Sequence, residues 1–272
     1  MTKKSAYIKT LIITSAIFVE SFFLTKAFIS YFETEGYFSL NPTSLSTICL
    51  LMLALTYTVS ISSPAWNEWS QFAIVPLPIT IGVYLNLFKL EPTNALVFSA
   101  VLFLVLSFFI EKSINLEQML AKNIPSVFLR PAIKGLLLGI SIVAACIVIL
   151  NPRDSAQEIT DTVEQATTNK VTEILRNKLG GQNSSISGLL DYTSLEQNIG
   201  DEITLQVKKA IEPYKQIINV LMAVFVFLAM QGINTIIYLI YSITVGVVFF
   251  AAEKTGLMRK ESTQIDKETL KF

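Results

Sequence analysis

Long apolar runs joined by short polar connections make up most of the chain. The longest run extends from Ile217 to Ala252 and contains no charged side chain. A helix needs about 20 apolar residues to cross a bilayer whose hydrocarbon core is about 30 Å thick. Backbone polar groups must be paired internally in hydrocarbon, and the alternating pattern of a membrane β-barrel is missing, so the pattern predicts membrane-spanning helices. Five shorter runs come before the longest one: Leu11–Phe32, Leu45–Ile61, Phe72–Phe88, Ala95–Ile110 and Ala132–Leu150.

The final apolar run can cross the membrane once or twice. One crossing places the basic C-terminal residues in the cytoplasm, as the bias of Lys and Arg toward that side favours. It also leaves many apolar side chains outside the hydrocarbon, each at a cost of about 1.5–3 kcal/mol if exposed to water. Two crossings bury them all and need a turn at Gln231–Asn234. Because the apolar cost is larger than the charge bias, we expect a membrane hairpin here and about seven spans in total.

A polar insert separates this run from the earlier ones. Pro152–Pro213 is rich in Thr, Asn, Gln and Ser, and two capping-box sequences predict two helices joined by a loop. Apolar residues then recur at alternating spacings of three and four and continue into the final run, which predicts a packing seam. We interpret the insert as an extracytoplasmic helical hairpin. The seam residues are the candidates for binding a partner: Ile203, Val207, Ala210 and Tyr214.

The sequence therefore predicts an all-α, polytopic membrane protein with four parts. Residues 1–151 form a five-span bundle, and residues 152–215 form the extracytoplasmic hairpin. Residues 216–252 form a C-terminal membrane hairpin, and residues 253–272 form a basic polar tail. Between the fourth and fifth apolar runs, Glu111–Pro131 has apolar residues at helical spacing. It is interpreted as a short amphipathic helix on the membrane surface, or as a solvated loop.

Four polar residues within the apolar runs are candidates for a functional role. Glu20 lies near the middle of the first run, where a carboxylate costs about 2.5–3.5 kcal/mol on insertion scales. It either forms a proton or cation site, or it reaches water because the helix is shifted or tilted. Lys26 is too far around the helix to pair with it and is expected to extend toward the outer surface. Gln231 and Asn234 are interpreted as turn residues, or as a buried polar pair that lines a pathway.

Two further patterns predict how the helices pack. Gly135 and Gly139 form a G-x-x-x-G motif in the fifth run, which lets another helix approach closely, within this chain or from a second one. Ser242 and Gly246 form a weaker pair in the final run. Pro76 and Pro78 predict that the third helix kinks or begins there, because proline lacks a backbone N–H and clashes with the preceding turn.

Composition removes several classes of function. The chain has no histidine, and its formal net charge is +0. The usual general base and the commonest metal ligand are therefore missing, and no overall positive field would attract nucleic acid. The two cysteines, Cys49 and Cys146, lie in apolar runs without neighbours at metal-ligand spacing. We expect no metal, no cofactor and no nucleic-acid partner.

Two short strings in the second half carry a resemblance. Leu129–Gly135 reads LRPAIKG, and Glu253–Gly256 follows the last apolar run. With the polar insert between them, they resemble multi-span membrane proteins of bacteria with small genomes, a group without an established activity. The resemblance implies a bacterial cytoplasmic (inner) membrane and no functional residue.

The function expected from these patterns is not enzymatic. We expect a scaffold or assembly component that the bundle anchors in the lipid bilayer and that binds a protein partner, or a second copy of itself, through the polar hairpin. The alternative is a transporter or channel with Glu20 as its acidic site and the proline break beside its pathway. An intramembrane enzyme that uses serine is a third possibility.

Overall fold

A computed structural model describes residues 3–36, 41–66, 70–119, 125–150 and 212–255, with isolated positions at 166, 170, 202, 205, 206, 209 and 210. The elements within these residues are all helices, so the all-α prediction is confirmed. Five of the helices are long and apolar enough to cross a membrane, and Phe72–Leu87 forms a shorter apolar one. The chain therefore has the architecture of an integral membrane protein. The predicted hairpin at 152–215 lies almost entirely outside the described residues.

The first two helices form an antiparallel pair. α1 (Lys3–Thr34) is followed by Gly36, whose φ of 80° favours glycine, and α2 (Pro42–Ser62) begins with proline at its first position. Asn41 caps α2, since its side chain accepts a hydrogen bond from the backbone N–H of Thr43 at 3.0 Å. The Asn41 amide also donates to the Glu35 carboxylate at 2.7 Å. These contacts hold the end of α1 to the start of α2.

The third apolar run is divided at the prolines, as the sequence predicts. α3 (Ser70–Ile74) ends before Val75, and α4 (Pro76–Leu87) begins at Pro76. A short 3-10 helix, η1 (Ser63–Ala65), leads into this region. Trp66 follows it and is buried, and its indole N–H donates to the Ser62 hydroxyl at 2.9 Å. The α3–α4 pair is therefore a broken helix and not a kinked one.

The connection between the fourth and fifth runs differs from the prediction. α5 (Pro92–Met119) is one helix that includes Glu111–Met119, so this part is not a separate surface helix. Within this part of α5, Ser113 is fully buried and donates to the carbonyl of Phe128 in the short helix α6 (Pro125–Phe128). α7 (Arg130–Leu150) follows directly.

The predicted membrane hairpin at residues 216–252 is wrong. η2 (Glu212–Tyr214) leads into α10 (Lys215–Lys254), a single helix of 40 residues that passes through Gln231–Asn234 without a turn. Gly232 costs only about 1 kcal/mol in a helix interior, and the Asn234 side chain forms hydrogen bonds with α7. Neither Gly232 nor Asn234 therefore needs a turn. At 1.5 Å per residue α10 is about 60 Å long, roughly twice the hydrocarbon thickness.

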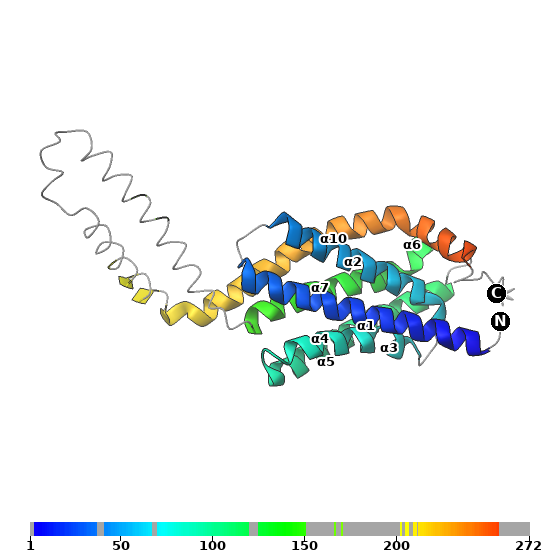
Figure 1. Ribbon diagram of the computed structural model, residues 1–272, viewed down its shortest axis with the longest axis horizontal. Coiled ribbons are helices and arrows are strands. Elements are labelled where there is room, and N and C mark those ends of the chain that lie inside the picture. Colours follow the sequence, from blue (N-terminus) through cyan, green and yellow to red (C-terminus); the bar gives the residue numbers. More distant parts are fainter. Residues whose placement is uncertain are drawn as a thin grey trace, which may run out of the picture.

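The helices run side by side along one common axis (Figure 1). α7 lies between α5 and α10 and packs mainly against these two, while α1 packs on α2 and α4, and α10 also contacts α2. The first turn of α10 extends beyond the ends of the neighbouring helices (Figure 1). The start of α1 and the end of α10 lie at the same end of the bundle, together with α6 (Figure 1).

Candidate functional site: polar side chains inside the bundle

Glu20 lies on the side of α1 that contacts α2. Its Oε1 accepts a hydrogen bond from the Thr58 hydroxyl at 2.9 Å, and the Ala54 carbonyl, 3.1 Å from the same hydroxyl oxygen, competes for its single proton. The other carboxyl oxygen, Oε2, is buried and has no hydrogen-bond partner among the described residues. Glu20 is therefore half-buried with one oxygen satisfied and one not. This is the only acidic side chain in the described part of the chain that combines these features.

Lys26 does not take part in this site. Its side chain is exposed, as the sequence predicts, and no contact joins it to Glu20. The two residues are six positions apart, so their side chains leave α1 in different directions. Among the described residues, Glu20 thus has a hydroxyl partner from another helix and no cationic partner.

Asn234 joins α10 to α7. It is almost fully buried, and its amide nitrogen donates to the Leu137 carbonyl at 2.8 Å and to the Ser141 hydroxyl at 2.7 Å. Its Oδ1 has no partner among the described residues, and the same is true of the buried Nε2 of Gln231. The interpretation of Asn234 as a turn residue is wrong. Asn234 lies within a continuous helix, and its amide forms an interhelical contact. Hydrocarbon favours such a contact because no water competes for the donor.

Gly135 and Gly139 pack against α5 of the same chain. A Cβ atom at Gly135 would overlap the Phe109 side chain, and one at Gly139 would lie 2.8 Å from the Leu102 Cδ1. The structure thus places this face against another helix of the same chain. By contrast, a Cβ at Gly246 would meet nothing within 4 Å, so the weaker glycine pair has no partner in this chain.

Sequence reasoning missed the junction between α1 and α4. A Cβ at Gly82 would overlap the Ser21 hydroxyl and lie 3.1 Å from the backbone nitrogen of Phe22. One turn later, the Asn86 amide donates to the Phe22 carbonyl at 3.0 Å and to the Gly82 carbonyl at 3.1 Å. The sequence feature that could have indicated this junction is the placement of Gly82 and Asn86 four residues apart in an apolar run.

A second missed contact lies between α2 and α10. The Ser60 hydroxyl donates to the Tyr241 hydroxyl at 3.0 Å, and the Tyr57 hydroxyl is hydrogen-bonded to that of Thr244. The Tyr57 and Tyr241 rings lie 5.8 Å apart, centroid to centroid. Hydroxyls inside a membrane helix can bond to their own backbone, so their sequence positions alone did not indicate this contact.

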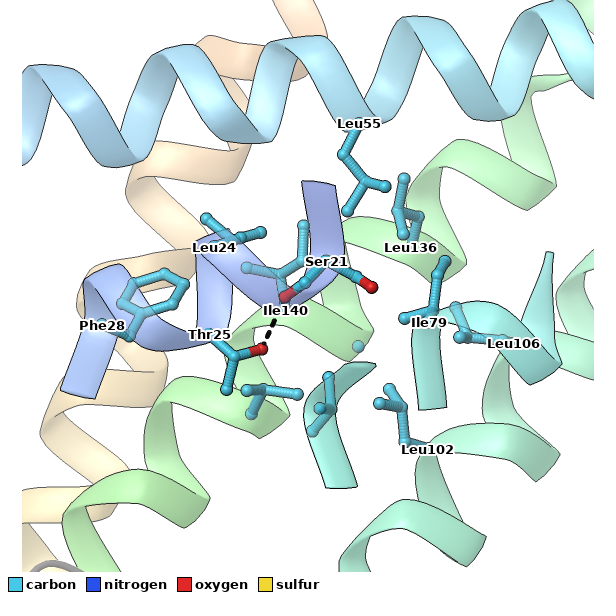
Figure 2. A pocket seen from close by; sticks show the side chains of 13 residues that line it. Ser21, Leu24, Thr25, Phe28, Leu55, Ile79, Leu102, Leu106, Leu136 and Ile140 are labelled. Atoms are coloured by element: carbon cyan, nitrogen blue, oxygen red, sulfur yellow. Dashed lines mark hydrogen bonds between the residues drawn. The ribbon is translucent and has the colours of Figure 1, made fainter. Parts of the chain in front are cut away.

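A small cavity lies at the centre of the bundle (Figure 2). Its volume is about 20 Å³, which is room for about one water molecule. Thr25 and Ser21 supply its polar side chains, but Thr25 donates to the Ser21 carbonyl at 2.8 Å and Ser21 to the Phe18 carbonyl at 2.9 Å. Pockets for small molecules are usually about 300–1,000 Å³, so this cavity is a packing void and not a ligand site.

The remaining predicted residues are only partly described. Ala210 and Tyr214 are exposed, while Ile203 and Val207 lie outside the described residues. No group of three His, Cys, Asp or Glu side chains that could hold a metal ion occurs in the part of the chain that the structure describes. No family model, curated protein or solved structure matches the chain.

Proposed function

We propose that the chain crosses a bacterial cytoplasmic membrane six times, with α3 and α4 together making the third crossing. The order of helices supports this, because successive helices run in opposite directions. The start of α1 and the end of α10 therefore lie at the same end of the bundle (Figure 1). The basic residues at that shared end also support it, since Lys and Arg accumulate on the cytoplasmic side. They are Lys3, Lys4, Lys9, Lys112, Arg130, Lys134 and Lys254.

Six crossings satisfy the charge bias, whereas α10, at about 60 Å, extends beyond the hydrocarbon and keeps apolar side chains outside it. The tail that follows α10 lies in the cytoplasm, and the polar insert lies outside. The test is a reporter fused after Phe272. We expect a fluorescent protein at this position to fold and alkaline phosphatase to be inactive. Active phosphatase would contradict the six-span topology.

We propose further that the protein is a non-enzymatic membrane scaffold, in which the bundle anchors a partner-binding insert. The observation that carries this proposal is how the buried amides are used. Asn86 and Asn234 each join two helices, and the central cavity has room for only about one water molecule. Such contacts stabilise one arrangement of helices and leave no room for a solute.

The route from the bundle to the insert is also consistent with a scaffold. α10 begins at Lys215, immediately after the insert, and its first turn extends past the neighbouring helices (Figure 1). Tyr214, just before it, is 59% exposed. A partner held by the insert would thus be connected to the bundle through one continuous helix.

Site-specific photo-crosslinking in intact cells tests the scaffold. A photoreactive phenylalanine analogue is placed at Tyr214, Val207 or Ile203, and the matched control is Ile243, which is exposed along α10. We expect a protein adduct, with a partner or a second copy, from the three insert positions and none from Ile243. Recovery of monomer alone at all three positions would reject the proposal.

The transporter remains the second candidate because of Glu20. A buried carboxyl oxygen without a partner is what a proton or cation site would offer. Purified protein in liposomes decides between the two functions. The scaffold predicts no ion flux above that of empty liposomes, and a Glu20→Gln variant that gives the same adducts. Flux that Glu20→Gln abolishes would replace the scaffold with a transporter.

A further inference from the structure

α7 presents one narrow strip of side chains that its neighbours do not cover. Apart from Pro131, every residue of α7 that is not buried belongs to this strip, and consecutive members are three or four positions apart. Such spacing places them on one face of a helix. The strip begins with two basic residues and continues with apolar ones: Arg130, Lys134, Leu138, Ile142, Ala145 and Ile149.

Two flanking helices make this strip a recess. Gly135 and Gly139 meet α5, while Leu137 and Ser141 meet α10 through Asn234. At about 100° per residue, the strip lies on the side of α7 between these two contacts. Leu138, Ile142 and Ala145 are partly exposed, so α5 and α10 flank the strip without closing over it, and the strip forms a shallow channel along α7.

The basic end of the strip has no acidic partner among the residues that the structure describes. Neither Arg130 nor Lys134 forms an ion pair with any described residue, and both are exposed. The Lys134 ammonium lies over the Tyr238 ring of α10, 5.7 Å from its centroid. This contact holds the ammonium at the boundary between α7 and α10.

We propose that this channel binds an anionic phospholipid, whose headgroup lies between Arg130 and Lys134 and whose acyl chain lies along the strip from Leu138 to Ile149. The kind of ligand follows from the order of side chains along the strip, in which two basic residues are followed by apolar ones. Two cations without an acidic partner among the described residues are continuous with an apolar recess that runs into the bilayer. The proposed six-span topology places them on the cytoplasmic side, where basic sites between membrane helices suit anionic headgroups. The proposal rests on the proposed six-span topology and not on the scaffold function.

The test is thermal unfolding of the full chain in a neutral detergent with added lipid. We expect dioleoyl phosphatidylglycerol to raise the Tm in a concentration-dependent way. Phosphatidylcholine with the same chains should not, and neither should glycerol phosphate, which supplies a phosphate without chains. An equal shift with phosphatidylcholine would overturn the proposal, and an equal shift with glycerol phosphate would show a free anion site instead of a lipid site.

Matched variants locate the site. Arg130→Gln with Lys134→Gln should weaken the apparent affinity for phosphatidylglycerol about 25-fold, or about fivefold for each residue. The control pair, Lys26→Gln with Lys89→Gln, removes two exposed cations from elsewhere on the bundle and should have no effect. An equal loss of affinity in both double variants would mean that the lipid is attracted by charge in general, and it would reject the site.

Ile142→Trp tests the apolar half independently. It keeps both cations and fills the recess, so we expect weaker binding of phosphatidylglycerol than in the wild type. Unchanged binding would reject the position of the acyl chain. If the double glutamine variant does not unfold cooperatively, this variant and the lipid comparison on the wild type still decide the outcome.

Discussion

α7 and α10 are both strongly apolar, but α7 lies inside the bundle and α10 lies at its edge. In the most hydrophobic window of each helix, 72% of the residues of α7 are buried inside the bundle, compared with 33% for α10. α7 is contacted by α5 on one side and by α10 on another, whereas one side of α10 is exposed along most of its length. Hydropathy alone does not distinguish the two helices, because lipid and a protein interior are equally apolar.

The difference comes from small residues that have a partner. Gly135 and Gly139 allow α5 to approach α7 closely, and the space above each is already filled. Gly232 and Gly246 in α10 have open space where a Cβ would be. A glycine in a membrane helix therefore marks a contact only where another helix uses the space that it leaves.

The largest expected effect comes from a methyl group added on α7. Gly135→Ala places a Cβ against the Phe109 side chain close to its backbone, where little movement is possible, and we expect a loss of about 1–3 kcal/mol in stability. Gly246→Ala, the matched control in α10, should leave stability unchanged or raise it by up to about 1 kcal/mol. Unfolding in detergent micelles measures both. Equal losses would remove the distinction between the two helices.

The α1–α4 junction extends the comparison to a glycine that lies outside any G-x-x-x-G motif. Gly82→Ala would overlap the Ser21 hydroxyl and approach the backbone of α1, so we expect a loss of about 1–2 kcal/mol. Ser21→Ala in the same chain should restore part of this loss by removing the hydroxyl. If stability is not restored at all, the backbone contact and not the hydroxyl accounts for the cost.

The polar contact between α7 and α10 should have the smallest effect. Asn234→Ala removes both hydrogen bonds to α7, and we expect a loss of about 1 kcal/mol. Thr235→Ala is the control, since its exposed hydroxyl bonds only to the carbonyl of Gln231 in its own helix. A double-mutant cycle of Asn234→Ala with Ser141→Ala should give a coupling of about 0.6 kcal/mol. A coupling of zero would mean that the two side chains act independently.

Part of this interior was predictable and part was not. The proline break at Pro76 and the close packing of Gly135 follow from local chemistry, because a missing N–H and a missing Cβ have the same effect in any context. Asn234 was assigned to a turn, since asparagine favours turns when it has no partner. Its actual partners, Leu137 and Ser141, lie more than ninety positions away. No local pattern could indicate them.

The sequence by itself determined that the chain is helical and belongs in a membrane, because uncharged apolar runs of this length must satisfy their backbone within each segment. It also determined where the helix between residues 70 and 87 divides. Only the tertiary structure decided that the last run is one helix and that α7 lies between α5 and α10. It also decided that the Glu20 carboxylate faces Thr58. These features depend on which surfaces meet, and apolar surfaces in lipid are distinguished by shape and by hydrogen bonds between distant segments, not by hydrophobicity.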